Sequence, residues 1–238
     1  MDPEISFVVP ALNEAGALPA VVEEIARAFA GRRHEIIVVD DGSRDATATV
    51  LAGLKAARPG LRVLRHARTA GQSRAILTGV RAARAPLIVT LDGDGQNDPK
   101  DAVTLVAALE ADAALALVAG ERTWREDSLV KRVASRLANG LRRRVLGDGA
   151  ADAGCGLKAF RREAFLRLPY FDHMHRFLPA LFRREGFRVA YRPVRGRPRR
   201  HGVSNYSVIG RLWVSIWDLA GVIWLAARAR DPGGCEEL

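Results

Sequence analysis

Leu87-Ile88-Val89-Thr90-Leu91-Asp92-Gly93-Asp94-Gly95-Gln96 is the stretch that decides the fold. It begins with apolar and β-branched residues, which are typical of a buried strand, and it ends in two carboxylates and an amide. Residues two apart on an extended chain point the same way, so Asp92, Asp94 and Gln96 can direct oxygen atoms toward one hard cation such as Mg²⁺ or Mn²⁺. A metal held by so few protein groups keeps positions open for substrate phosphates. The alternative interpretation is an ordinary turn, because Asp and Gly supply the backbone angles that turns need.

The length and the cysteines bound the class of protein. With 238 residues the chain can bury a good core in one domain. Its two cysteines, Cys155 and Cys235, lie far apart, and the acidic start Met1–Glu4 does not resemble a cleavable leader. Neither a secreted disulfide framework nor a zinc module is expected, and a reducing cytoplasm is the expected compartment.

The net charge of +10 is unevenly distributed. Residues 122–205 hold 21 Lys or Arg against 7 Asp or Glu, so the remainder of the chain is slightly acidic. A block of this kind predicts a phosphate-bearing partner, which is a nucleic acid, an anionic lipid or a phosphorylated substrate.

The first 120 residues alternate short apolar runs with helix-like segments, which predicts βαβ units. The expected strands are Ile5–Val9, Glu35–Val39, Leu61–Arg65, Leu87–Leu91 and Ala114–Ala119, and the expected helices are Ala17–Ala30, Asp45–Ala56, Gln72–Ala83 and Asp101–Leu109. Strands this rich in Val, Ile and Leu indicate a sheet that is buried on both faces.

Three of the expected strands run into polar loops, which contain Asn13-Glu14, Asp40-Asp41-Gly42-Ser43 and the Asp92–Gln96 stretch. Ligands of such sheets bind at the carboxyl ends of the strands, so the three loops are expected to share one edge. A weaker sign is Thr69–Ser73, where small residues with free amides open a helix and could face a phosphate.

Beyond residue 120 the βαβ pattern stops. Residues 122–147 are basic and helix-prone, residues 152–160 predict a turn and a strand, and residues 176–186 predict a helix. The segment 195–206 is a basic loop of a kind that can close over an anionic substrate.

The last expected helix, Leu212–Ala227, is apolar except for Ser215 and Asp218 and carries three of the four tryptophans. Its sixteen residues reach about 24 Å, which is shorter than the roughly 30 Å hydrocarbon layer of a membrane. Tryptophan prefers the headgroup boundary, so the favoured interpretation is a helix lying in the membrane interface. The alternative is an ordinary core helix.

The motifs Val8-Val9-Pro10-Ala11-Leu12-Asn13-Glu14, Val39–Thr47 and Leu91–Pro99, in this order and spacing, resemble the family-2 glycosyltransferases of GT-A fold. Gln96 and the segment Arg199–Tyr206 are similar to the polyprenyl-phosphate branch, of which dolichyl-phosphate mannose synthase is the familiar example. The resemblance covers about Ile5 to Tyr206 and implies a Rossmann-like α/β fold with a mixed, mostly parallel sheet flanked by helices. The expected organisation is a catalytic domain in residues 1–206 (a nucleotide-sugar half 1–120 and an acceptor half 121–206), a C-terminal interfacial amphipathic helix in 207–229 and a tail in 230–238.

The resemblance also implies roles for individual residues. The nucleotide-sugar would be bound by Pro10, Leu12, Glu14, Asp40, Asp41, Asp92, Gly93, Asp94 and Arg199, and the metal by Asp94 and Gln96. The acceptor phosphate would be bound by Arg122, Lys131, Ser135 and Arg136. The catalytic set would be Asp92, Asp94, Arg122 and Arg199, with Ser204 and Tyr206 on the same closing loop as Arg199. Many relatives have lysine where Asn205 stands, so a charged contact from that position is in doubt.

The implied activity is metal-dependent, inverting transfer of a sugar from a GDP- or UDP-linked donor to a polyprenyl phosphate of the undecaprenyl or dolichyl type. An acceptor phosphate is already anionic near neutral pH, so no strong general base is required. The implied partners are the nucleotide-sugar, the polyprenyl phosphate and the cytoplasmic face of the cell membrane, with no nucleic acid. A homodimer or an integral membrane partner is the other route to the membrane.

Other functions are weighed against this one. The same fold could serve an acceptor that is not a polyprenyl phosphate. A nucleotidyltransferase would need a glycine-rich loop with a lysine after the first strand, where this chain has Asn13-Glu14. A nucleic-acid-binding protein would need aromatic residues outside the terminal helix, and a silent membrane adaptor would not need the Asp92–Gln96 set. His173 and His175 with Asp172 are interpreted as structural rather than as a second metal site.

Overall fold

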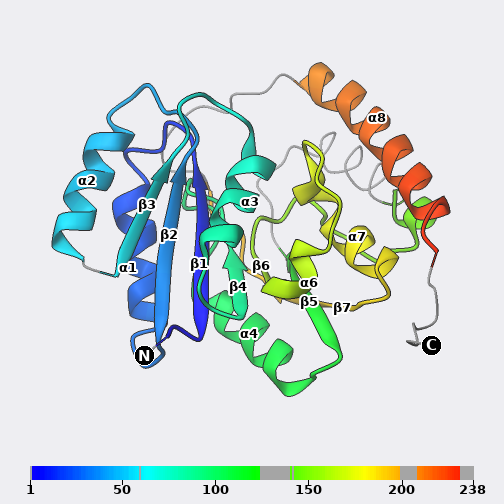
Figure 1. The fold of residues 1–238 in the computed structure, drawn as a ribbon, viewed down its shortest axis with the longest axis horizontal. Helices are drawn as coiled ribbons and strands as arrows, with labels where there is room; N and C mark the ends of the chain where they lie inside the picture. Colours follow the sequence, from blue (N-terminus) through cyan, green and yellow to red (C-terminus); the bar gives the residue numbers. More distant parts are fainter. Residues whose placement is uncertain (1, 59, 124–139, 141, 199–207, 231–238) are drawn as a thin grey trace, which may run out of the picture.

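The computed structural model describes residues 2–58, 60–123, 140, 142–198 and 208–230, with the side chains of 208–215 left aside. In this part of the chain seven strands form one sheet in the order β3-β2-β1-β4-β6-β5-β7 (Figure 1). They are β1 Ile5–Ala11, β2 His34–Asp40, β3 Leu61–Arg65, β4 Leu87–Thr90, β5 Leu115–Arg122, β6 Lys158–Arg161 and β7 Arg188–Val194. The prediction of a mixed, mostly parallel sheet is confirmed.

The strand directions bring most polar loops to one edge. β1 runs parallel to β2 and β4, and β5 runs parallel to β7, whereas β6 is antiparallel to both β4 and β5. The carboxyl ends of β1, β2, β4, β5 and β7 therefore lie at the same edge as the first residue of β6. We call this the carboxyl edge.

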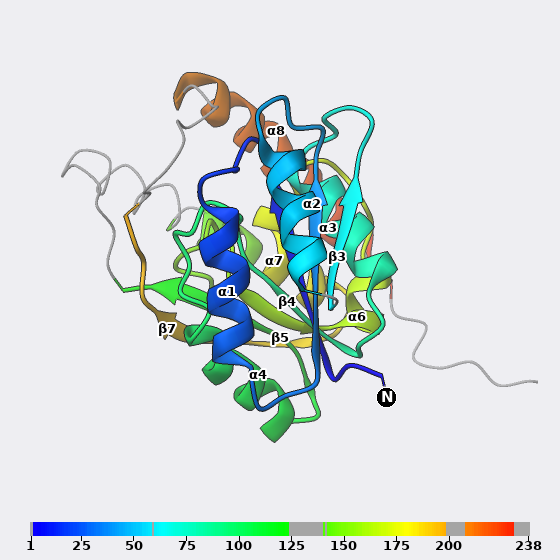
Figure 2. The ribbon, with the colours of Figure 1, turned by 90° about the vertical axis from the view of Figure 1, so that its left-hand side faces the viewer.

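Helices cover both faces of the sheet (Figures 1 and 2). They are α1 Leu18–Ala28, α2 Thr47–Ala57, α3 Gln72–Ala82, α4 Asp101–Ala111, α6 Arg162–Leu166, α7 Leu178–Arg184 and α8 Val208–Ala227, with a 3₁₀ turn, η1, at Met174–Arg176. Because side chains alternate along a strand, Phe7 and Val9 of β1 pack in the core that α1 and α4 cover, and Val8 packs in the core under α3. The elements predicted in the first 120 residues agree with these bounds to within three residues.

The second half departs from the expected elements. Arg122 ends β5 instead of opening a helix, and residues 142–146 are helical, while most of the predicted basic helix lies outside the described residues. The strand β7 lies between the predicted helix over 176–186 and the predicted basic loop over 195–206, and no element was predicted there, because exposed arginines and Pro193 interrupt the apolar pattern of a strand.

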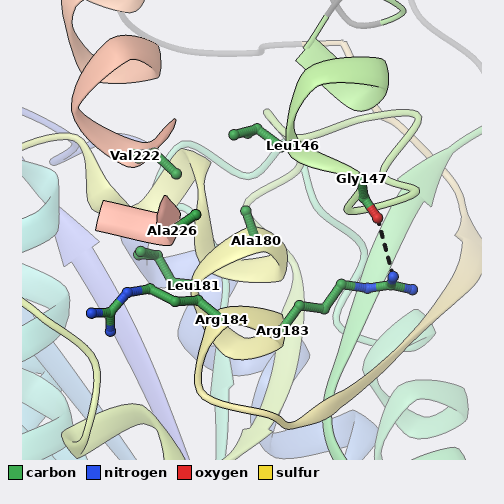
Figure 3. A pocket seen from close by; sticks show the side chains of 8 residues that line it. All are labelled: Leu146, Gly147, Ala180, Leu181, Arg183, Arg184, Val222 and Ala226. Atoms are coloured by element: carbon green, nitrogen blue, oxygen red, sulfur yellow. Dashed lines mark hydrogen bonds between the residues drawn. The ribbon is translucent and has the colours of Figure 1, made fainter. Parts of the chain in front are cut away.

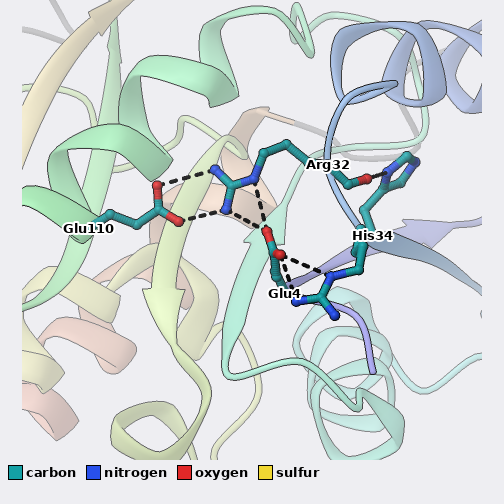
Figure 4. A network of polar contacts seen from close by, with 5 residues as sticks. Glu4, Arg32, His34 and Glu110 are labelled. Atoms are coloured by element: carbon teal, nitrogen blue, oxygen red, sulfur yellow. Dashed lines mark hydrogen bonds and ion pairs between the residues drawn. The ribbon is translucent and has the colours of Figure 1, made fainter. Parts of the chain in front are cut away.

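The opposite edge of the sheet holds a cluster of paired charges (Figure 4). Glu4 accepts hydrogen bonds from Arg32 Nε at 3.1 Å and Arg33 Nε at 3.0 Å, and Arg32 also pairs with Glu110 at 2.7 Å. These contacts join the start of β1, the turn before β2 and the end of α4. The charges of this edge satisfy one another, and they are exposed enough that each pair contributes little to stability.

The terminal helix α8 packs against α7. Val222 is buried in this contact, and Arg184 Nε donates to the carbonyl of Leu225 at 3.0 Å. None of the helices in the described part of the chain has the length and apolar character needed to cross a membrane.

Candidate active site

The loops after β1 and β2 are joined by hydrogen bonds at the carboxyl edge. The amide of Asn13 donates to Ser43 Oγ at 2.9 Å, and the amide of Arg44 donates to Asn13 Oδ1 at 2.9 Å. Asn13 has a φ of 57°, in the left-handed region that asparagine tolerates better than most residues. The amide of Glu14 donates to Thr47 Oγ1 at 3.0 Å. The two loops therefore form one unit that places Glu14 and the Asp40-Asp41 pair together.

Asp40 and Asp41 are both buried, but their carboxylates have different surroundings. Asp40 Oδ1 accepts the amide of Ser43 at 2.9 Å, and its Oδ2 lies 3.2 Å from Arg65 Nε. Asp41 accepts the amides of Ala70 at 2.9 Å and Gly71 at 2.8 Å. Asp41 therefore fixes the loop before α3.

This contact corrects one prediction about the loop before α3. The amides of Ala70 and Gly71 are bound by Asp41 and are not free to face a phosphate. Asp41 itself also contacts His66 Nδ1 at 2.6 Å, so the carboxylate predicted to bind the donor has a clear structural task.

The loop after β4 is a tight turn that holds its two acids at the edge. The amide of Gln96 donates to Asp94 Oδ1 at 3.0 Å, and the amide of Asp92 donates to Asn97 Oδ1 at 3.2 Å. Gly95 has a φ of 76°, a conformation that glycine adopts without strain. Asp94 is 8% exposed, so its carboxylate lies in a largely dry place.

Asp92 faces the second half of the chain. Its Oδ1 accepts a hydrogen bond at 2.7 Å from Nε2 of Gln72, which is the first residue of α3. Burial and then the neighbouring Asp94 raise the pKa of Asp92 to about 6, while the cations Lys158 and Arg122 act in the opposite direction. A carboxyl group with this environment at a sheet edge is typical of a functional site.

Two cationic side chains, Arg122 and Lys158, lie near Asp92. Arg122, at the end of β5, makes a two-pronged contact with Asp152, with Nε to Oδ2 at 2.6 Å and Nη2 to Oδ1 at 3.0 Å. Lys158, the first residue of β6, is 3% exposed and donates from Nζ to the carbonyl of Cys155. Burial lowers the pKa of Lys158, and nearby anionic groups including Asp92 and Asp152 oppose that shift.

The segment after β7 is joined to the loop after β4 by backbone hydrogen bonds. The amide of Arg197 donates to the carbonyl of Gln96 at 3.0 Å, and Gly196 forms a β-bridge with Asn97. The guanidinium of Arg197 pairs with Glu24 and with Asp98, each at 2.6 Å. The basic loop predicted over 195–206 therefore begins directly beside Gln96 and Asn97.

The structure brings most of the predicted site residues to one edge. Those on or next to it are Pro10, Leu12, Glu14, Asp40, Asp41, Asp92, Gly93, Asp94, Gln96 and Arg122. The others lie outside the described residues, namely Lys131, Ser135, Arg136, Arg199, Ser204 and Tyr206.

Sequence reasoning missed three residues of this edge, which are Gln72, Gly156 and Lys158. A Cβ atom at Gly156 would lie 2.3 Å from Asp92 Oδ2, so the missing side chain makes the space that the carboxylate occupies. The sequence could have singled out Lys158, because it is one charged residue among the apolar neighbours Leu157, Ala159 and Phe160.

The oxygen atoms of the loop after β4 fit a divalent cation of the Mg²⁺ or Mn²⁺ type, because the side chains of Asp94 and Gln96 offer hard oxygen ligands in a turn. Among the residues that the structure describes, no group of three or more His, Cys, Asp and Glu gathers as a metal cluster.

His173 and His175 face different elements. The ring of His175 contacts Ser73 Oγ through Nδ1 at 2.8 Å, and burial holds the pKa of His175 well below its usual value. The ring of His173 lies 3.2 Å from Asp218 of α8. These contacts agree with the structural interpretation of the two residues.

A separate hollow of about 270 Å³ lies between α7 and α8 (Figure 3). Leu181, Val222 and Ala226 line it, and the guanidinium of Arg183 at its rim donates to the carbonyl of Gly147 at 3.1 Å. None of its lining residues belongs to the predicted donor, acceptor or metal set, so we do not assign the transfer chemistry to it.

Comparison with known proteins decides the family. The sequence profile described as "Glycosyl transferase family 2" matches residues 6–168, which include the loops after β1, β2 and β4 and the first part of the second half. The chain belongs to glycosyl transferase family 2. The family predicted from the strand-end motifs is therefore confirmed.

Curated relatives belong to the polyprenyl-phosphate branch. The chain is 38% identical over 237 residues to a dodecaprenyl-phosphate galacturonate synthase of Rhizobium johnstonii, covering 97% of this chain and 69% of that protein. It is 36% identical over 209 residues to an undecaprenyl-phosphate 4-deoxy-4-formamido-L-arabinose transferase of Edwardsiella ictaluri, covering 86% of this chain and 63% of that protein. The chain thus spans about two thirds of the length of these relatives.

Solved structures share the fold. Glucosyl-3-phosphoglycerate synthase from Mycobacterium tuberculosis in complex with UDP aligns with a TM-score of 0.70 at 21% identity, covering 97% of this chain and 82% of that chain. The same enzyme with Mn²⁺, UDP and phosphoglyceric acid aligns with a TM-score of 0.71 at 21% identity, covering 97% of this chain and 81% of that chain. At this level of identity the likeness shows the fold alone.

Proposed function

We propose that this protein is a metal-dependent, inverting glycosyltransferase that moves a sugar from a nucleotide-sugar to a polyprenyl phosphate. The observation that carries the proposal is the meeting of Asp92, Asp94 and Gln96 with the buried Lys158 and the half-buried Arg122 at one sheet edge. An acidic turn suits a metal-bound diphosphate, and adjacent cations suit a second phosphate.

The donor is assigned to the first half of the edge. Glu14 and Asp40 offer acceptors for ribose hydroxyls and ring N–H groups, while Asp41 fixes the loop before α3 beside them. Asp94 and Gln96 would hold Mg²⁺ or Mn²⁺ with the diphosphate, and the bound cation supplies charge stabilisation for a departing nucleoside diphosphate. The UDP complexes of the solved neighbours with Mn²⁺ and Mg²⁺ support the metal in this role.

The acceptor is assigned to the second half. A phosphate oxygen of the lipid forms a bond to the anomeric carbon as the bond from that carbon to the diphosphate oxygen breaks, and the nucleoside diphosphate leaves with the electron pair. Arg122 neutralises the charge of the approaching phosphates. Attack from the face opposite the leaving group inverts the anomeric configuration, and no strong base is needed.

The function is tested by a transfer assay with the full chain. A panel of UDP- and GDP-sugars, including hexose, hexuronate and modified pentose donors, is incubated with undecaprenyl phosphate and Mn²⁺, and the product is identified by mass. We expect a lipid-phosphate-linked monosaccharide that EDTA suppresses and added Mn²⁺ or Mg²⁺ restores.

The alternative acceptor is tested in the same assay. A parallel arm offers phosphoglyceric acid, which one of the solved neighbours binds. Sugar transfer to that acid with none to the lipid would replace the proposed acceptor, and no transfer to either would overturn the assignment.

Membrane contact is proposed for α8, which would hold the catalytic domain (residues 1–206) at the cytoplasmic face of the membrane. Trp217 is 73% exposed and Trp224 is 60% exposed, and both lie on the side of α8 away from buried Val222. Arg228 lies over the Trp224 ring at 5.9 Å, which combines a cation with an interfacial aromatic residue. A homodimer or an integral partner would add to this contact.

The double variant Trp217→Ser/Trp224→Ser is expected to bind anionic phospholipid vesicles at least about tenfold more weakly, since withdrawing each large apolar side chain from the lipid costs about 1.5–3 kcal/mol. Vesicle sedimentation measures this. The matched control, Val103→Ser/Leu166→Ser, changes two exposed apolar residues on α4 and α6 and should bind like the original protein. Equal binding by all three proteins would contradict a membrane role for α8.

A further inference from the structure

Lys158 is buried at the centre of the candidate site. As the first residue of β6 it pairs across the sheet with Thr90, two residues before Asp92. Its side chain is 3% exposed, whereas Lys55 and Lys100 lie at the protein surface. The hydrogen bond that the structure gives its ammonium goes to the neutral carbonyl of Cys155.

A charged lysine in such a place is costly unless nearby anions compensate it. The anions that act on Lys158 are Asp92 and Asp152, together with the Cys155 thiol group if it ionises. Asp152 already forms the two-pronged contact with Arg122. Asp92 is the other carboxylate that acts on Lys158, and it follows Thr90, the residue paired with Lys158 across the sheet, by two positions.

Asp92 needs a cationic partner. Its Oδ2 lies against the backbone of Gly156, and its Oδ1 accepts one hydrogen bond, from the neutral amide of Gln72. A second carboxylate, Asp94, stands two residues away and repels it. A fixed cation behind Asp92 offsets that repulsion and holds the carboxylate where the donor sugar is proposed to bind.

We propose that Lys158 is a positioning residue for sugar transfer, whose ammonium group acts through Asp92 and holds that carboxylate in place at the carboxyl edge. The inference rests on the proposed function, because Asp92 is the group through which Lys158 acts. Lys158 has no contact with substrate in this role, and it differs from Arg122, which neutralises the phosphates.

The alternative is a purely structural lysine, and the two roles make opposite predictions. A structural lysine that ties Cys155 to β6 would, when removed, lower stability and the fraction of active enzyme while leaving the donor KM unchanged. A positioning lysine would, when removed, raise the donor KM and lower kcat in protein that is still folded. Replacing a buried cation by an apolar side chain of similar length is often neutral for stability.

The experiment compares Lys158→Met and Lys158→Arg with the full-length protein, using the donor and acceptor identified by the transfer assay. For Lys158→Met we expect kcat to fall at least about tenfold and the donor KM to rise several-fold, as for the loss of one charge interaction at a site. Lys158→Arg keeps the charge, so it should recover part of the lost activity. The thermal midpoint of Lys158→Met should change less than that of the control.

The matched control is Arg161→Met, which removes a cation from the same strand. Arg161 holds the carbonyls of Leu115 at 2.8 Å and Leu109 at 3.0 Å, away from Asp92. It should lower the thermal midpoint and leave the donor KM unchanged.

The outcomes separate the inference from the proposed function. If the unmodified protein transfers sugar and Lys158→Met has the same donor KM, or if Lys158→Arg recovers nothing while stability falls, the positioning role is overturned. If the unmodified protein transfers no sugar, the proposed function itself has failed. In that case the inference falls with it.

Discussion

The variant Asp94→Ala is expected to lose metal-dependent sugar transfer by at least about a thousandfold, a loss of the size seen when a principal electrostatic group of an active site is removed. Asp94 is 8% exposed, and its carboxylate accepts a hydrogen bond from the amide of Gln96, so the turn holds it in one place. Initial rates measured across a Mn²⁺ titration provide the test. If high Mn²⁺ partly restored the transfer rate of Asp94→Ala, Asp94 would be assigned as a ligand of the cation.

The control for this variant is Asp112→Ala, which removes an exposed carboxylate at the end of α4. Asp112 pairs with Arg188, the first residue of β7, at 3.2 Å, at the edge of the sheet opposite to the proposed donor site. Its rate should stay close to that of the original protein. Unchanged turnover in Asp94→Ala, with full Mn²⁺ dependence, would remove the metal site from the loop after β4.

The first half of the fold could be predicted because its signals are local. Each strand there is an apolar run of four to seven residues that ends in a polar loop, and the carboxyl ends of parallel strands must share an edge. The prediction that Asp40 and Asp92 lie together follows from that rule alone. Helix ends were less certain, because a helix boundary depends on contacts that lie beyond the neighbouring residues.

The second half could not be predicted to the same depth, since its strands are placed by pairing and not by pattern. The short strand β6 has only four residues and inserts between β4 and β5 in the opposite direction. An apolar run does not reveal its neighbours or its direction. The strand β7 has exposed arginines on its outer edge, so it lacks the apolar alternation by which a strand is recognised.

The same difference applies to the candidate site. Asp92 and Asp94 could be found because two acids after a strand form a pattern, and Arg122 could be found through the family resemblance. Gln72 lies twenty residues before Asp92 in the chain, and Gly156 lies sixty-four residues after it. Only the tertiary fold brings them into contact with Asp92. For Asp41 the sequence predicted a contact with the ligand, because an acidic residue follows the strand. In the structure its carboxylate binds the backbone of the loop before α3.

Gly156→Ala is expected to abolish most of the transfer activity while the protein stays folded. The backbone of Gly156 is outside the left-handed region, so alanine meets no backbone strain there. The added methyl group would instead lie 2.3 Å from Asp92 Oδ2 and 2.5 Å from Asp92 Cγ, closer than atoms in contact can approach. The carboxylate must then rotate or shift, which would break its hydrogen bond with Gln72.

A displacement of this size at a reacting centre costs about a hundredfold in rate or more, because catalysis depends on positions held to within about 1 Å. In the control, Gly120→Ala on β5, the added methyl group would lie 3.0 Å from the carbonyl oxygen of Leu157 and from the side chain of Val194, and Asp92 is not among the atoms it would meet. Both variants should lose roughly 1–3 kcal/mol of stability from overpacking, measured by urea unfolding. If Gly120→Ala kept the original donor KM and kcat while Gly156→Ala had a much lower kcat or a higher donor KM, the loss of activity would be attributed to displacement of the Asp92 carboxylate. If both variants were equally active, the carboxylate of Asp92 would not need the position in which the fold holds it.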